Sequence, residues 1–413
     1  FWLKLGSATP SEDRRQFFFP AALVGKMVKS WPWLALAGAY TSYAFLTPPM
    51  TRMTQPRLRG GAKTSGFESD HTAWGTTGTV WAAAALGVSL AVARRASDAD
   101  FEGFSYKKAF FFPGQGAQAV GMCQELAAEV PKAKEMFETA SDIVGYDLLD
   151  LCINGPKEEL DKTAVSQPAI FVASMAAVEK LRAEGGADAI EEATVAMGLS
   201  LGEYSALSFA GALSFEDGVK VTKVRGEAMQ AAADAAASGM VSVVGLDSEK
   251  TEELCAKVCE LTGQRIQIAN YLCKGNYTVS GDKEACAKLA EIAKPEFKAR
   301  MAVPLAVAGA FHTDFMAPAV EKLEEVLASV DLKTPRIPVV SNVDAKPHSD
   351  PETIKAILAK QVTAPVQWET QMKDLSSSGS FEQGYECGPG KVIAGIMKRI
   401  DKTAAANITN ITA

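Results

Sequence analysis

Short apolar runs, glycine-containing turns and helical patterns follow one another along the chain from residue 106 onward. The apolar run 107–112 enters the turn 113–118 and then a helical stretch, and the run 193–197 enters a second such turn. Strand, glycine turn and helix in succession are typical of a parallel α/β sheet. Further helices are predicted at 132–144, 167–183 and 215–235.

A different pattern begins near residue 240. Strands are predicted at 241–244, 265–272, 277–280 and 299–305, with helices at 249–261 and 284–293. This βαββαβ order is typical of a ferredoxin-like unit. The α/β pattern then resumes, with helices at 315–330 and 351–360, strands at 337–341 and near 381–386, and a closing helix.

We therefore expect an α/β fold in which a large, hydrolase-like domain with a parallel sheet contains an inserted small ferredoxin-like domain. The predicted large domain covers 106–238 and 307–402, the small domain 239–306, and a tail 403–413. A cleft is expected between the two domains.

Residues 1–105 differ from the rest and are predicted to be a largely disordered targeting leader. A short basic segment from Met27 precedes the apolar run 31–46, as in a signal peptide, and the basic, Thr/Gly/Pro-rich segment 47–78 resembles a transit peptide. A second apolar run, 80–93, is short for a membrane span. The combination resembles the multipart leaders of plastid proteins, so we expect localisation in the plastid stroma, with the membrane involved only during targeting. A permanent N-terminal membrane anchor is the alternative.

Composition narrows the classes of function. The 413 residues are 47% hydrophobic, which is ample for a globular core, and the net charge of −7 argues against a nucleic-acid partner. The seven cysteines include no CxxC pair and no cluster with histidine, so no metal site is expected. An odd number of scattered cysteines suits a reducing compartment.

The most informative segment is Met197–Tyr204, which contains a Gly-x-Ser-x-Gly turn centred on Ser200. A serine on a sharp strand-to-helix turn exposes its hydroxyl, while the flanking glycines let the backbone bend and the helix pack closely. The following helix directs free N–H groups and its positive dipole end to the same place. This pattern predicts a serine-dependent acyl-transfer enzyme. A dinucleotide site at the earlier turn 113–118 is disfavoured because that turn lacks G-x-G-x-x-G spacing.

A serine nucleophile needs a base. After the leader the chain has only His312 and His348. His348 lies in a polar loop, whereas His312 lies at the junction where the small domain rejoins the large one, which is expected to overhang the cleft. Arg225 is a further candidate: it lies on an amphipathic helix, and a guanidinium that points into the cleft would bind both oxygens of a carboxylate.

These residues belong to a larger set of motifs that closely resembles the malonyl-CoA:acyl-carrier-protein transacylase family from about Tyr106 to Ile400. The motifs are Phe112–Gly116, Ser166–Ala169, Gly198–Tyr204, Arg225–Gly226, Gly309–His312, Pro365–Trp368 and Gly388–Lys391. The resemblance implies transfer of the malonyl group from malonyl-CoA to the phosphopantetheine thiol of acyl carrier protein, through a malonyl-serine intermediate, in fatty acid synthesis. It implies no cofactor, because coenzyme A and phosphopantetheine enter as parts of the substrates. Polyketide synthesis is the alternative use of the malonyl group, and we expect a monomeric enzyme.

The resemblance also assigns roles to individual residues. Ser200 is the implied nucleophile, His312 the base and Arg225 the carboxylate clamp. The backbone N–H groups of Gln115 and Leu201 form the implied oxyanion hole, and the main-chain carbonyl of Gln361 orients the histidine. Gln167 and Asn270 are weaker candidates for lining the cleft. Leu199 departs from many bacterial members, which have histidine there, and resembles plant and algal plastid members.

Two other functions remain open at this stage. An α/β-hydrolase-type esterase or thioesterase shares the serine turn but needs an acid after Ser200 and a histidine later still. Asp314 or Asp344 would serve as the acid. A degenerate scaffold that only binds carrier protein is the second alternative.

Overall fold

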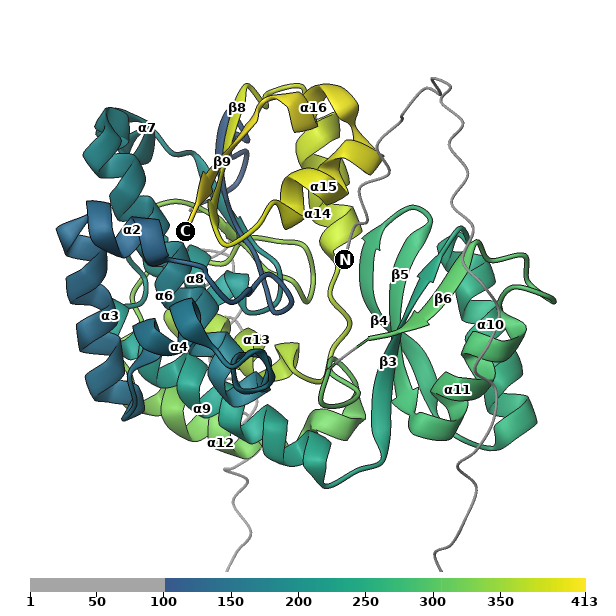
Figure 1. Ribbon diagram of the computed structural model, residues 1–413. Helices are drawn as coiled ribbons and strands as arrows, with labels where there is room; N and C mark the ends of the chain where they lie inside the picture. The colour runs from purple at the N-terminus through teal and green to yellow at the C-terminus, as the bar shows by residue number, and fades with distance from the viewer. Residues whose placement is uncertain (1–100, 306) are drawn as a thin grey trace, which may run out of the picture. The chain divides into compact units, whose positions relative to one another are not determined.

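The computed structural model describes residues 101–305 and 307–413, so the predicted leader lies outside the described residues. Within them, a parallel five-stranded sheet has the order β7-β2-β1-β8-β9 (Figure 1). Its strands are β1 (Lys108–Phe112), β2 (Val195–Gly198), β7 (Val339–Val340), β8 (Gln383–Gly388) and β9 (Ile408–Thr412). Within the described residues, no helix is long and apolar enough to cross a membrane.

Helices cover both faces of this sheet, which explains why β1 is apolar at nearly every position. Phe110 and Phe112 belong to one buried cluster and Ala109 and Phe111 to another, so alternate side chains of β1 enter opposite layers. The helices of the first layer are α2 (Gln124–Glu129), α3 (Pro131–Val144), α4 (Leu148–Asn154), α5 (Lys157–Leu160), α6 (Thr163–Leu181), α7 (Ala187–Glu191), α8 (Gly202–Phe209), α9 (Phe215–Asp234), α12 (Ala317–Ser329) and α13 (Pro351–Gln361). Those of the second layer are α14 (Trp368–Ser377), α15 (Val392–Ile400) and α16 (Lys402–Ala406). The large unit also contains a short π-helix, η1 (Arg182–Gly186), and a short 3₁₀-helix, η2 (Asp314–Met316).

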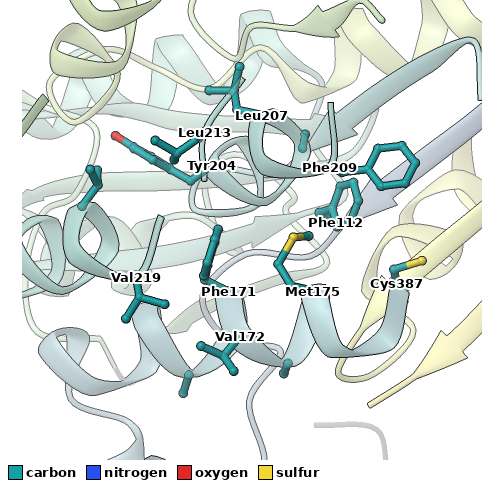
Figure 2. Close-up of a cluster of buried hydrophobic side chains, with 14 of the residues drawn as sticks. Phe112, Phe171, Val172, Met175, Tyr204, Leu207, Phe209, Leu213, Val219 and Cys387 are labelled. Carbon is teal, nitrogen blue, oxygen red and sulfur yellow. The ribbon is translucent and has the colours of Figure 1, made fainter. Parts of the chain in front are cut away.

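The first layer fixes the helix that follows the serine turn. Figure 2 shows Tyr204 and Leu207 of α8 in the same buried cluster as Phe171 of α6, with Phe112 of β1 close by. Tyr204 is fully buried. Burying such large apolar side chains is the main force that holds α8 against the sheet.

The small unit is a four-stranded antiparallel sheet of order β4-β5-β3-β6, which is the ferredoxin-like arrangement expected from the βαββαβ pattern. Its elements are β3 (Ser238–Val244), α10 (Ser248–Thr262), β4 (Ile266–Cys273), β5 (Asn276–Asp282), α11 (Lys283–Ile292) and β6 (Met301–Pro304). Both helices pack on one face of the sheet through a separate buried cluster. The edge strand β4 is joined to the large unit at Val366, whose N–H donates to Ala269 O and whose carbonyl accepts from Tyr271 N (2.8 and 3.0 Å).

The C-terminal residues differ from the prediction. Residues 403–413 were assigned to a tail outside the large domain, but Ile408–Thr412 forms β9 and pairs in parallel with β8. Ile411 is only 7% exposed and joins the first cluster. Four of the five residues of β9 are β-branched and favour a strand, but the segment becomes part of the large domain only through its pairing with β8, which no local pattern reveals.

Candidate active site

Ser200 occupies a strained turn between β2 and α8. Its φ of 53° lies in the left-handed region, which a non-glycine residue adopts at an energetic cost. Both flanking glycines are required by close packing: a Cβ on Gly198 would lie 1.9 Å from the carbonyl carbon of Gly202, and a Cβ on Gly202 would lie 2.1 Å from Phe112 O. The turn therefore has the geometry expected of a nucleophile elbow.

Asn342, a residue that the sequence analysis missed, holds this turn from the neighbouring strand. It follows β7, and its Oδ1 accepts from the backbone N–H of Ser200 (2.5 Å) while its Nδ2 donates to Gly198 O (2.7 Å). The side chain is fully buried. The one available sequence signal was its position directly after a predicted strand, because the carboxyl ends of parallel strands meet at one edge of the sheet.

His312 lies against the serine, as predicted. Its Nε2 is 2.9 Å from Ser200 Oγ, and its Nδ1 is 2.8 Å from the main-chain carbonyl of Gln361. A carbonyl can only accept, so Nδ1 carries the proton and Nε2 is left free to accept the serine proton. Burial lowers the pKa of His312 to about 4, and the positive charge of Arg225 adds to this effect. The ring is therefore neutral at physiological pH, which is the state a base requires.

The carboxylates considered for a hydrolase-type triad do not occupy the triad position. Asp344 pairs instead with His348, at 2.9 Å between Oδ2 and Nε2. Asp314 lies in η2, and no hydrogen bond joins it to His312 among the described residues.

Arg225 projects from α9 to the same point and is 1% exposed. Its Nη1 donates to Gln167 Oε1 (2.7 Å), and its Nη2 donates to Gln361 Oε1 (2.9 Å) and, at 3.3 Å, to Ser200 Oγ. The guanidinium also lies over the Tyr204 ring, 5.2 Å from its centroid. Within the described part of the chain no carboxylate forms an ion pair with Arg225. The result is a buried, preorganised cation whose opposite charge must come from elsewhere.

A cleft of about 100 Å³ opens over these groups, with walls from both units. Gln115 and Asn270 line it together with Ser200, Arg225 and His312. Gln167 accepts a hydrogen bond from Arg225 and does not line the cleft. The side chain of Leu201 is fully buried and does not line it either. The remaining lining residues are mainly apolar: Gly114, Leu199, Met229, Met240, Leu305, Val307 and Phe311. A larger cavity, of about 460 Å³, lies beside Phe209 and Arg336, but neither Ser200 nor His312 lines it.

The predicted oxyanion donors are placed consistently with that role. Across residues 101–305 and 307–413, no oxygen accepts a hydrogen bond from the backbone N–H of Gln115 or Leu201. Gln115 follows β1, and its side chain is anchored by Nε2 donating to Thr163 Oγ1 (3.1 Å). Leu201 directly precedes the first turn of α8, where backbone N–H groups lack intrahelical partners.

Within the described residues, no group of three or more His, Cys, Asp or Glu side chains is arranged to hold a metal ion.

Comparison with known proteins agrees with this geometry. The acyl transferase domain family matches residues 109–389. The mouse mitochondrial malonyl-CoA-acyl carrier protein transacylase is 39% identical over 335 residues, which cover 79% of this chain and 85% of the mouse protein. The chain belongs to the malonyl-CoA-acyl carrier protein transacylase family. The Bacillus subtilis member is 40% identical over 296 residues, covering 72% of this chain and 91% of that protein.

Solved structures of the family share the fold. The transacylase FabD of Coxiella burnetii superposes with a TM-score of 0.70 at 36% identity, covering 75% of this chain and 94% of that structure. A malonyl-transacylase in complex with a type II polyketide synthase acyl-carrier protein gives a TM-score of 0.68, also at 36% identity, over 74% of this chain and 94% of the other.

Proposed function

We propose that this chain transfers a malonyl group from malonyl-CoA to the phosphopantetheine thiol of acyl carrier protein. The observation that carries the proposal is that a neutral imidazole and a buried guanidinium both lie within hydrogen-bond distance of one serine hydroxyl. The first two groups serve acyl transfer in general. The third selects an acyl group that carries its own carboxylate.

In the first half-reaction, Ser200 Oγ attacks the thioester carbonyl carbon while its proton moves to His312 Nε2. The backbone N–H groups of Gln115 and Leu201 bind the oxyanion, an interaction typically worth about 3 kcal/mol per donor. The carbon–sulfur bond then breaks, the departing thiolate of coenzyme A takes the proton from His312, and an ester on Ser200 remains.

In the second half-reaction, the carrier-protein thiol gives its proton to His312 Nε2 and its sulfur attacks the ester carbonyl. Ser200 Oγ leaves and recovers the proton. The Gln361 carbonyl keeps the proton of His312 on Nδ1 throughout, so a neighbouring carboxylate is not needed to orient the ring.

Arg225 binds the malonyl carboxylate in both halves. Of its four Nη hydrogens, two bind the amide oxygens of Gln167 and Gln361. The second hydrogen of Nη1 and the Nη2 hydrogen directed to Ser200 Oγ can therefore bind the carboxylate. Desolvated bonds of this kind reject an analogue that lacks the carboxylate.

Incubation of the protein with malonyl-CoA tests the proposal. Intact-protein mass spectrometry should show one malonyl ester, which peptide mapping places on Ser200 and which disappears when phosphopantetheinylated carrier protein is added. Ser200→Ala should form no ester. Release of free malonate at the rate at which coenzyme A is released would instead indicate a thioesterase.

Three further parts of the proposal concern the cell. We propose that the malonyl group supplies fatty acid synthesis, that the enzyme acts as a monomer without a cofactor, and that it works in the plastid stroma. Eukaryotic relatives in mouse and Drosophila melanogaster are named as mitochondrial, so the compartment needs its own test. Fractionation of the organism's organelles, with sequencing of the mature N-terminus, distinguishes plastid, mitochondrion and membrane. Activity that survives EDTA tests the absence of a metal cofactor, and a monomeric mass in solution tests the oligomeric state.

A further inference from the structure

Glu203 is a buried carboxylate to which the proposed reaction assigns no role. It lies in the first turn of α8, three residues after Ser200, and is 3% exposed. Its Oε2 accepts from the backbone N–H of Asn342 (2.9 Å) and from Gln361 Nε2 (2.7 Å). No lysine or arginine among the described residues forms an ion pair with it. Burying a carboxylate without a direct cation is costly, so its presence at this position calls for a function.

The contacts of Gln361 indicate that function. Its side-chain Nε2 donates to Glu203 and, at 3.2 Å, to the carbonyl of Ser200, while its Oε1 accepts from Arg225 Nη2. An ionised Glu203 can only accept, and Arg225 can only donate. The amide between them therefore has a single favourable orientation, since a flipped amide would place two donors together at Arg225 and two acceptors together at Glu203.

We propose that Glu203 is a positioning residue for carboxylate recognition. It orients the Gln361 amide, and through this amide it fixes the Arg225 guanidinium beside Ser200. The inference rests on the proposed function and extends it to a residue that does not touch the substrate.

Protonation of Glu203 should weaken this arrangement. A protonated carboxyl can donate a hydrogen bond to Gln361 Oε1, which permits the flipped amide. In that orientation Gln361 Nε2 faces Arg225, and two donors oppose each other. Burial raises the pKa of Glu203 to about 7, although the hydrogen bonds from Asn342 and Gln361 oppose the shift. The charged and titratable groups that face Glu203 are Arg225 from α9, and Asp344 with its partner His348 from the loop after β7. Recognition of malonyl-CoA should therefore decline as pH falls through about 7, well above the pKa of about 4 for His312.

The test compares malonyl-CoA with acetyl-CoA as donors for the purified full-length protein, with carrier protein as acceptor. Glu203→Gln keeps an acceptor oxygen and the side-chain volume but removes the charge and the fixed orientation. Gln361→Met removes the amide and keeps the main-chain carbonyl that binds His312. Each variant should lower kcat/KM for malonyl-CoA by ~10-fold or more, chiefly through KM, as expected for a lost hydrogen bond to a charged group, with a smaller loss for acetyl-CoA. In Glu203→Gln the decline of malonyl transfer near pH 7 should disappear.

A double variant separates positioning from independent effects. If Glu203 acts through Gln361, the double variant should lose no more malonyl selectivity than the worse single variant. Equal losses for both donors, or selectivity losses that add in the double variant, would overturn the inference. If Glu203→Gln does not fold, Gln361→Met still decides the question, because the decline of malonyl transfer near pH 7 should disappear once the amide through which Glu203 acts is removed, and its persistence would overturn the inference. Absence of malonyl transfer in the wild-type protein would instead refute the proposed function, so the two failures are distinguishable.

Discussion

Replacement of Arg225 by methionine should convert the protein from a malonyl-selective into a weakly selective acyltransferase. The guanidinium is buried, binds two glutamine amides and has two N–H groups left for a substrate carboxylate. A hydrogen bond to a charged group contributes about 1.5–3 kcal/mol, so the loss of two should cost about 3–6 kcal/mol of transition-state binding. At about 1.4 kcal/mol per factor of ten, this lowers kcat/KM for malonyl-CoA by roughly 10²–10⁴-fold.

The assay follows release of coenzyme A and formation of acyl carrier protein, with malonyl-CoA and acetyl-CoA measured side by side. Acetyl transfer needs no carboxylate clamp. Arg225→Met should therefore lower acetyl transfer only to the extent that it disturbs the Gln167 and Gln361 amides. Arg225→Lys is the matched control: it keeps the charge but not the planar fork, and should retain an intermediate malonyl activity. Equal losses for the two donors in Arg225→Met would refute the reasoning, because the guanidinium would then support the site without recognising the carboxylate.

Three other results are expected. Acetyl transfer, which depends on neutral His312, should stay constant as pH falls from neutral and drop only near pH 4; in Arg225→Met, which removes the neighbouring positive charge, this drop should move to higher pH. Gly202→Ala should destabilise the protein by about 3 kcal/mol or more in chemical denaturation, because its Cβ would meet Phe112 O, whereas Gly395→Ala, where nothing lies within 4 Å, should be neutral or stabilising. Deletion of 403–413 should lower stability by at least about 2–5 kcal/mol, the usual cost of losing one buried isoleucine, and an unchanged denaturation midpoint would contradict the assignment of β9 to the sheet.

The sequence predicted those parts of the site that depend on adjacent residues or on a residue type that is rare in the chain. The serine turn was predictable because glycine spacing, apolar strand and helix are adjacent in the chain. His312 could be selected because only one other histidine follows the leader. Arg225 was a candidate because it lies on an amphipathic helix, and resemblance to a family gave roles to it and to the Gln361 carbonyl. The structure places Arg225 beside the serine and the Gln361 carbonyl beside His312.

The parts that the sequence did not reveal depend on contacts between distant segments. Asn342 lies 142 residues from Ser200, and nothing in its local pattern indicates that its side chain would hold the serine turn. The same is true of the contact between Glu203 and the side chain of Gln361, which are 158 residues apart. A glutamate in the first turn of a helix is ordinarily a solvated residue that complements the helix dipole. Only the packing of α8 against β7 and α13 makes this one a buried partner.

The most direct test of the account is peptide mapping of the protein after brief exposure to malonyl-CoA without carrier protein. A malonyl ester should form on Ser200 in the wild-type protein and in the Gly395→Ala control, should be absent from Ser200→Ala, and should be passed to carrier protein when carrier protein is added. A malonyl group on any other side chain would contradict this mechanism, and so would an ester on Ser200 that is hydrolysed faster than it is transferred to carrier protein.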